Sequence, residues 1–266
     1  MDRSGRRGFG CGCGVIVVAA VVLVIALVGW GVAVFGDSNP LRRLEPVPPG
    51  VPPAGGEAVP PIDTSTPGRN SEKLGFWSKP ISDKTLVNQQ ALNAYGQAEL
   101  VAAQRWPQCH LRWNTLAGIG WVETRHGTYN GDLLHRPHLD ADGVATPKVV
   151  GVPLDGSPGF AEIQDTDGGE LDGDAKFDRA VGPMQFIASS WRQHGHDGNG
   201  DGVKDPSQID DAALSAADLL CSGGNDLATP EGWTTAIRAY NNSNSYVNKV
   251  RDAAASYSVP QPAAAR

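Results

Sequence analysis

Positive charge is sparse and unclustered beyond residue 43, and this lack excludes a large class of partners. The chain has 266 residues, with 22 Lys and Arg against 29 Asp and Glu, and a formal net charge of -7. Binding to nucleic acid requires clustered Lys and Arg that neutralise phosphates, so no nucleic-acid partner is expected. The sequence also lacks a Gly-x-Ser-x-Gly element and a phosphate-binding loop, which argues against the serine hydrolases and nucleotide hydrolases that carry these motifs.

Charged residues are absent from residues 15–35, an apolar run of about 21 residues that, as a helix, suffices to cross a hydrocarbon core of about 30 Å. Three arginines precede the run and an aspartate follows it: Arg3, Arg6, Arg7 and Asp37. Because positive charge favours the cytoplasmic side, we expect residues 1–14 in the cytoplasm, a signal anchor in the membrane at 15–36 and the rest of the chain outside. A cleaved signal peptide is the alternative, although its apolar region usually has only about 7 to 15 residues.

Cysteine occurs only four times, and the four residues divide by compartment. Cys11 and Cys13 precede the apolar run, whereas Cys109 and Cys221 lie in the part expected outside the membrane. Disulfides persist in oxidising compartments. Cys109 and Cys221 are therefore expected to pair, and two buried free thiols are the alternative.

Proline is concentrated in residues 37–80, which contain ten prolines and almost no periodic apolar pattern. Such a segment is predicted to be a disordered, extended linker that holds the next domain away from the membrane. Apolar residues at helical spacing then return, and strand signals are weak apart from residues 148–153. The fold class expected for residues 81–258 is therefore mostly α, with a long irregular insertion at 128–180 and a flexible tail at 259–266.

One acidic residue stands near the C-terminal end of an otherwise apolar helix, which is predicted from Leu111 to His126. This residue is Glu123, and both the negative end of the helix dipole and burial would raise the pKa of its carboxyl group. A carboxyl group that stays protonated near neutral pH can serve as a general acid. The alternative is a surface glutamate paired with Arg125.

Three blocks of sequence include or follow this glutamate. The first is Glu-Thr-Arg-His-Gly at residues 123–127. The second comprises Gly182, Gln185, Phe186, Ser189 and Ser190, and the third comprises Tyr240, Asn241 and Ser243. In residue type, spacing and order they resemble the blocks of the membrane-bound lytic murein transglycosylase B family, within the lysozyme-like superfamily. Ala188 departs from the pattern, which often has proline there, and this change is expected to affect rigidity more than chemistry.

The resemblance implies a lysozyme-like helical domain that cleaves the β-1,4 bond between N-acetylmuramic acid (MurNAc) and N-acetylglucosamine (GlcNAc) in peptidoglycan. Glu123 would act as acid and then as base, the 6-hydroxyl of MurNAc would attack to form a 1,6-anhydro ring, and the chemistry would need no cofactor. The residues implied in substrate binding are Gln185, Tyr240, Asn241, Phe186, Met184 and Ser189. A lysozyme-type hydrolase that uses water and a noncatalytic wall-binding scaffold are the alternatives.

A loop after the second block begins like a calcium-binding motif. Asp197, Asn199 and Asp201 occupy positions 1, 3 and 5, and a glycine occupies position 6, but Gln208 stands where the motif has glutamate. The family resembled here has an enlarged loop closed by a later aspartate. It therefore implies a structural calcium site with these ligands: Asp197, Asn199, Asp201, the Val203 carbonyl and Asp211, or Asp210 in place of the last. A solvated turn is the alternative.

Overall fold

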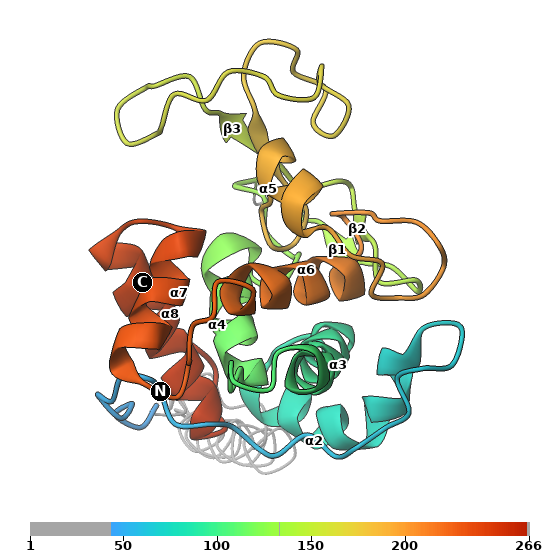
Figure 1. Ribbon diagram of the computed structural model, residues 1–266, viewed down its shortest axis with the longest axis vertical. Coiled ribbons are helices and arrows are strands. Elements are labelled where there is room, and N and C mark those ends of the chain that lie inside the picture. The colour runs from blue at the N-terminus through green and yellow to red at the C-terminus, as the bar shows by residue number, and fades with distance from the viewer. Residues whose placement is uncertain (1–43, 133, 265–266) are drawn as a thin grey trace, which may run out of the picture. The chain divides into compact units, whose positions relative to one another are not determined.

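Helices supply most of the regular structure, as the sequence predicts (Figure 1). The computed structural model describes residues 44–132 and 134–264. These contain one 3-10 helix and seven α-helices: η2 (Asn70–Leu74), α2 (Gly75–Thr85), α3 (Gln89–Arg105), α4 (Trp113–Thr124), α5 (Ala188–His194), α6 (Ile209–Cys221), α7 (Pro230–Tyr240) and α8 (Asn244–Ser258). The expected signal anchor at 15–36 lies outside the described residues. Within them, no helix combines the length and the apolar character needed to cross a membrane.

Two short antiparallel strand pairs lie in the irregular insertion and at its end. β1 (His138–Leu139) pairs with β2 (Ala145–Thr146), and β3 (Val150–Pro153) pairs with β4 (Arg179–Val181). β3 confirms the strand signal at residues 148–153. The chain between β3 and β4 consists of turns and isolated bridges. The β3–β4 pair therefore fastens the base of this loop to the segment that leads into α5 (Figure 1).

The apolar helix α4 lies in the core of the helical part. Its Leu116 and Ile119 are fully buried, and it packs chiefly against α8 and also against α3. At Gly118 a Cβ atom would lie 2.7 Å from the Val250 carbonyl oxygen of α8, so this close approach of the two helices requires glycine. The close packing fixes the C-terminal end of α4, where Glu123 is found, relative to α8.

The structure corrects the prediction that residues 37–80 form a disordered linker. The part from residue 44 onward runs along the helices, and residues 70–80 lie in η2 and α2. The Glu57 carbonyl oxygen accepts a 2.8 Å hydrogen bond from Trp113 Nε1. The Ala54 carbonyl oxygen likewise accepts a 2.9 Å bond from Asn114 Nδ2. Prolines restrict φ in the unfolded chain, so this extended segment loses little entropy on docking, and its free carbonyl groups satisfy buried donors.

The C-terminal segment also departs from the prediction of a flexible tail. Gln261 is buried and exchanges two hydrogen bonds with the backbone of Glu45, at 2.8 Å and 2.9 Å. Ala263 is buried as well. The two ends of the described chain thus pack together, and the tail docks because a single amide side chain pairs with both backbone groups of one residue.

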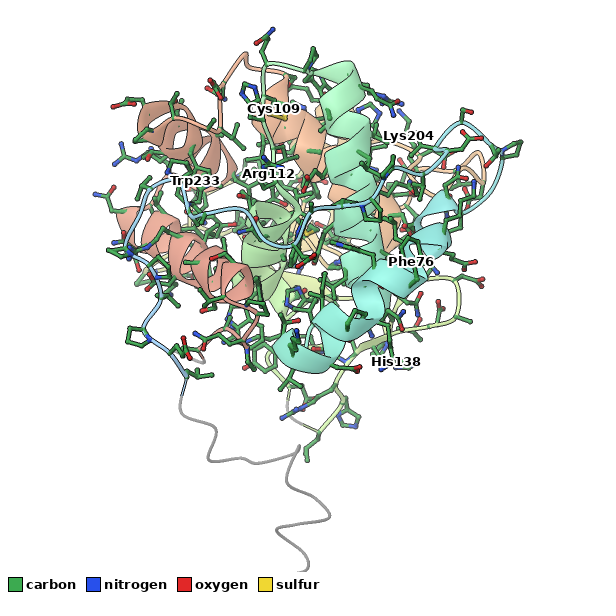
Figure 2. All side chains as sticks on the ribbon, turned by 90° about the horizontal axis from the view of Figure 1, so that it is seen from below. Phe76, Cys109, Arg112, His138, Lys204 and Trp233 are labelled. Atoms are coloured by element: carbon green, nitrogen blue, oxygen red, sulfur yellow. A yellow bond between two sulfur atoms is a disulfide. The ribbon has the colours of Figure 1, made fainter. Side chains whose placement is uncertain are left out.

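The predicted disulfide between Cys109 and Cys221 is present. Their Cα atoms are 5.3 Å apart and 112 residues separate them in sequence. Cys109, labelled in Figure 2, lies in the connection between α3 and α4. Cys221 is the last residue of α6. The bond therefore ties the chain just before α4 to the end of α6.

Candidate active site

Glu123 lies in the last turn of α4, and its carboxyl group faces a tyrosine of α8. Its Oε1 accepts a hydrogen bond of 2.5 Å from Tyr246 Oη. The helix ends one residue later at Thr124, because Arg125 and His126 both adopt left-handed backbone conformations, with φ of 53° and 62°. The side chain is partly buried. Glu123 is therefore a sheltered carboxyl group that keeps some contact with solvent.

The environment raises the pKa of Glu123 to about 7. Burial is the larger cause, because it disfavours the charged carboxylate, and the hydrogen bond from Tyr246 opposes it. Burial also raises the pKa of Tyr246 well above its usual value, so its hydroxyl stays protonated and donates. Near neutral pH the Glu123 carboxyl group is thus divided between its acid and base forms, as a group that both gives and takes a proton requires.

A row of aromatic rings connects Glu123 with the second sequence block. The ring of Tyr246 lies parallel to that of Tyr240, with centroids 6.4 Å apart. Tyr240 Oη donates a 2.6 Å hydrogen bond to the Met184 carbonyl oxygen. Phe186 meets the ring of Tyr240 edge-on at 5.9 Å. The third sequence block and the second therefore meet beside the carboxyl group.

The second block is also bonded directly to the end of α4. Thr124 Oγ1 donates to the Pro183 carbonyl oxygen at 2.6 Å and accepts from the Gly127 backbone N–H at 2.7 Å. Gln185 has φ of 52°, and its Nε2 donates to the Gly182 carbonyl oxygen at 3.0 Å. Residues 182–185 therefore form a tight turn. This turn contains Gln185 and, through Pro183, contacts Thr124, the residue after Glu123.

The remaining residues predicted to bind substrate fall into two groups. Met184 and Phe186 are 0% and 2% exposed, so their side chains support the site from inside and offer no surface for a sugar. Asn241 and Ser189 are exposed, at the end of α7 and in the first turn of α5. Of the predicted set, Asn241 and Ser189 are thus exposed, and Gln185 and Tyr240 are partly buried.

Sequence reasoning missed Tyr246, which makes the direct contact with Glu123. It follows the third block by three residues and lies in the first turn of α8, where Ser243 Oγ accepts a hydrogen bond from its backbone N–H at 3.4 Å. The available signal was a serine in the N-cap position of a helix. Ser243 as the N-cap predicts a helix that begins at residue 244, and Tyr246 then lies in its first turn, close to the third block.

A buried histidine, also missed, fixes the chain just after Glu123. His126 is 3% exposed and lies between two tyrosines, with Nδ1 3.1 Å from Tyr95 Oη and Nε2 3.0 Å from Tyr257 Oη. Burial lowers its pKa to about 3, so the ring is neutral and can accept at one nitrogen and donate at the other. His126 thus connects the end of α4 to α3 and α8.

The predicted calcium ligands lie together in one loop. Asp197 accepts hydrogen bonds from the backbone N–H groups of Gly200 and Gly202, at 2.6 Å and 2.8 Å. Asp211 closes the loop by accepting from Gly198 N–H at 2.7 Å. Burial and the charge of Asp197 raise the pKa of Asp211 to about 7. The carboxylates of this loop thus accept hydrogen bonds from its own backbone N–H groups, and calcium binding here stays a prediction from the motif.

Asp210, the alternative residue for closing the calcium loop, forms an ion pair with Arg69 instead. Its Oδ2 is 2.7 Å from Arg69 Nε, and its side chain is fully buried. A second group of carboxylates that could hold a metal, Asp165, Asp167 and Asp178, lies in the insertion, and its members each offer an oxygen within 4.8 Å of the others. Among the described residues, the acidic side chains close enough together to share a metal ion are therefore those of the insertion, whereas those of the predicted calcium loop are not.

Comparison with known proteins gives two similarities. A family model described as a transglycosylase SLT domain matches residues 175–234, the part of the chain that carries Gln185 and Asp211. Among solved structures, the Escherichia coli lytic transglycosylase Slt35 in complex with bulgecin A is similar at a TM-score of 0.38 and 15% identity, over 74% of this chain and 80% of that one. No curated protein matches the chain.

Proposed function

We propose that this chain, which carries a transglycosylase SLT domain, is a lytic transglycosylase that cleaves the MurNAc–GlcNAc β-1,4 bond of peptidoglycan and leaves a 1,6-anhydro-MurNAc end. The match to residues 175–234 includes the second of the three sequence blocks and supports the class of enzyme inferred from them, while Glu123 and the third block lie outside the matched residues. One observation supports Glu123 as the acid and base of this reaction. Its carboxyl group is sheltered where the blocks meet, and burial raises its pKa to about 7.

The reaction requires a proton donor before it requires anything else. Cleavage of a glycosidic bond leaves positive charge on the anomeric carbon and negative charge on the departing oxygen. Protonated Glu123 gives its proton to the O4 of the departing GlcNAc as the bond from C1 to that oxygen breaks. The resulting carboxylate then takes the proton of the MurNAc 6-hydroxyl while O6 bonds to C1. Glu123 ends protonated, and no water is consumed.

The family resemblance implies a mechanism with one carboxyl group. Ordinary glycosidases place a second carboxylate about 5 to 10 Å from the first. In the proposed mechanism Glu123 performs both proton transfers, as its pKa of about 7 allows. An internal nucleophile such as the sugar's own 6-hydroxyl, which the substrate acetamido group can assist, makes a second carboxylate unnecessary.

Tyr246 and Tyr240 act as positioning residues in this proposal. Tyr246 holds the carboxyl group of Glu123 in one orientation through its 2.5 Å hydrogen bond. Tyr240 holds the loop containing Gln185 through its bond to the Met184 carbonyl oxygen. The amide groups of Gln185 and Asn241 would then bind hydroxyl or acetamido groups of the sugars, as the family resemblance implies.

The disulfide supports an extracytoplasmic location. Bonds such as Cys109–Cys221 persist in oxidising compartments and are rare in the cytosol. Peptidoglycan lies in the same compartment. A signal anchor at residues 15–36 would hold the enzyme at the membrane, and this part of the proposal rests on the apolar sequence alone.

Analysis of the reaction products tests the proposed reaction. Purified sacculi are digested with the protein, and the soluble fragments are identified by mass spectrometry. Fragments that end in 1,6-anhydro-MurNAc, which are lighter than the corresponding reducing fragments by one water, are the expected result. Reducing MurNAc ends would identify a hydrolase instead. Intact strands after prolonged incubation would identify a noncatalytic wall-binding protein.

A further inference from the structure

The insertion contains a cavity that the chemistry above does not use. It is an open depression of the surface with a volume of about 450 Å³. The charged side chains that line it are Asp172, Asp174, Lys176 and Arg179. Its described lining contains no aromatic residue, so a sugar ring would find no surface on which to stack. The lining suits a ligand with ionised groups.

A single residue, Gly151, lies between this cavity and Gln185, which is predicted to bind substrate. Gly151 of β3 follows Val150, which lines the cavity. On one side, the Gly151 carbonyl oxygen accepts a 3.3 Å hydrogen bond from Arg179 Nη1. On the other, a Cβ atom at Gly151 would lie 3.1 Å from Gln185 Oε1. A glycan bound at Gln185 would therefore have this cavity within reach of its substituents.

The charged side chains of the cavity differ in the partners they have within the protein. Asp174 Oδ2 pairs with Arg179 through Nε at 3.0 Å and Nη2 at 2.8 Å, so these two groups neutralise each other. Asp172 accepts from the backbone N–H groups of Asp174 and Arg179. Lys176 is exposed. Its Nζ lies 4.9 Å from the centroid of the Phe177 ring. Hydrogen bonds from Ser157 and, more weakly, the charge of Lys176 lower the pKa of Asp155, although among the described residues Lys176 and Asp155 form no direct ion pair. The ammonium group is thus exposed and can approach a ligand.

The chemistry of peptidoglycan indicates which part of it would bind here. The hydroxyl and acetamido groups of its sugars are neutral, and the lactyl carboxyl group of MurNAc is joined to the stem peptide as an amide. The ionised groups of a strand therefore lie in the stem peptides, which carry free carboxylates. We propose that the cavity is a subsite for the stem peptide, in which Lys176 binds a stem carboxylate. This inference rests on the proposed function and adds a substrate preference to it.

The test compares two substrates and three proteins. Glycan strands with free stem carboxylates, and the same strands with those carboxylates converted to amides by a carbodiimide and ammonia, are cleaved by wild type, Lys176→Ala and Lys84→Ala. Lys84 is an exposed lysine at the end of α2 and serves as the matched control. Lys176→Ala is expected to lower kcat/KM on strands with free stem carboxylates by roughly twofold to fivefold, the size of one exposed charge pair. The loss should lie in KM and shrink at high salt.

The outcomes separate this inference from the proposed function. Strands with amidated stems should be cleaved equally by all three proteins, and Lys84→Ala should match wild type on both substrates. Equal loss by Lys176→Ala on both substrates, or no loss on either, would overturn the stem subsite while leaving the transglycosylase in place. Failure of wild type to cleave either substrate would instead reject the proposed function.

Discussion

The carboxyl group of Glu123 is subject to two opposing influences, and their balance sets its protonation. Burial raises its pKa and the hydrogen bond from Tyr246 lowers it, with a result of about 7. A buried carboxyl group without the tyrosine would hold its proton too tightly to act as a base. A solvent-exposed one would lose its proton too early to act as an acid. The tyrosine thus keeps both steps of the proposed reaction accessible at one pH.

This balance predicts a pH dependence of cleavage. The acid form of Glu123 is present below its pKa, so kcat should fall as pH rises through about 7. Tyr246→Phe removes the group that lowers the pKa. The alkaline limb of the profile should therefore move upward by roughly one pH unit, the size of a hydrogen bond to a charged group. The maximal rate should fall as well, because the carboxyl group loses its orientation.

Tyr129→Phe is the matched control for this measurement. Tyr129 is an exposed tyrosine in the insertion, and removing its hydroxyl should leave the profile in place. An alkaline limb that stays fixed in Tyr246→Phe, or moves to lower pH, would contradict the assigned role of the hydrogen bond.

Among the elements, α4 and α5 show what the sequence can predict and what it cannot. The apolar pattern predicts a helix from Leu111 to His126, and α4 spans Trp113–Thr124. For α5 the same reasoning places the start at Pro183, five residues before the observed start at Ala188. The intervening residues form a turn because the backbones of Val181 and Phe186 pair with each other. Such pairing depends on a neighbouring strand, and helical periodicity carries no information about it.

The ends of α4 are held by residues distant in sequence. At its N-terminus, Glu99 of α3 accepts a 2.6 Å hydrogen bond from the Trp113 backbone N–H, where negative charge stabilises the helix dipole. At its C-terminus, His126 is held between tyrosines of α3 and α8. Each contact joins residues that no local pattern relates, which explains why the sequence indicated Glu123 but not its supports.

The disulfide is expected to make a large contribution to stability. Closing a loop of 112 residues reduces the entropy of the unfolded chain, a contribution of about 4 to 5 kcal/mol in the chain-entropy model. Replacing Cys109 and Cys221 together with serine should therefore lower the free energy of unfolding by roughly 3 to 5 kcal/mol in urea titrations. Reductant should lower the stability of wild type to that of the variant and leave the variant unchanged. Equal stability of the two oxidised proteins would contradict this role.

The loop closed by Asp211 is expected to bind calcium, which should raise the melting temperature. At about 100 times its Kd, a ligand of the native state adds roughly 2.7 kcal/mol, or a shift of roughly 5 to 10 °C for a domain of this size. Asp197→Ala should abolish the shift, because Asp197 occupies the first position of the loop, which the motif reserves for aspartate. Asp167→Asn, in the carboxylate group of the insertion, should leave it intact. The reverse result would place the ion in the insertion, and no shift in wild type would remove both sites.

At the scale of the whole molecule, the largest departure from the sequence-based prediction is the Pro-rich segment. Its composition correctly indicates that it forms no core of its own. From residue 44 onward it nevertheless packs against the rest of the fold, and the carbonyl groups of Ala54 and Glu57 accept hydrogen bonds from Asn114 and Trp113 of α4. The helical class and the irregular insertion follow from local sequence patterns, and the disulfide follows from the expected compartment. The structure confirms these three predictions. The docked segments and the cavity of the insertion depend on tertiary contacts and were not predictable.

The most direct test of the account is cleavage of sacculi by Glu123→Gln, which keeps the size of the side chain and removes its proton chemistry. Its rate of 1,6-anhydro product formation should fall by about 10²- to 10⁴-fold, the contribution of general acid–base catalysis. Glu170→Gln, at an exposed position of the insertion, should retain the wild-type rate. Undiminished formation of anhydro products by folded Glu123→Gln would contradict the central claim.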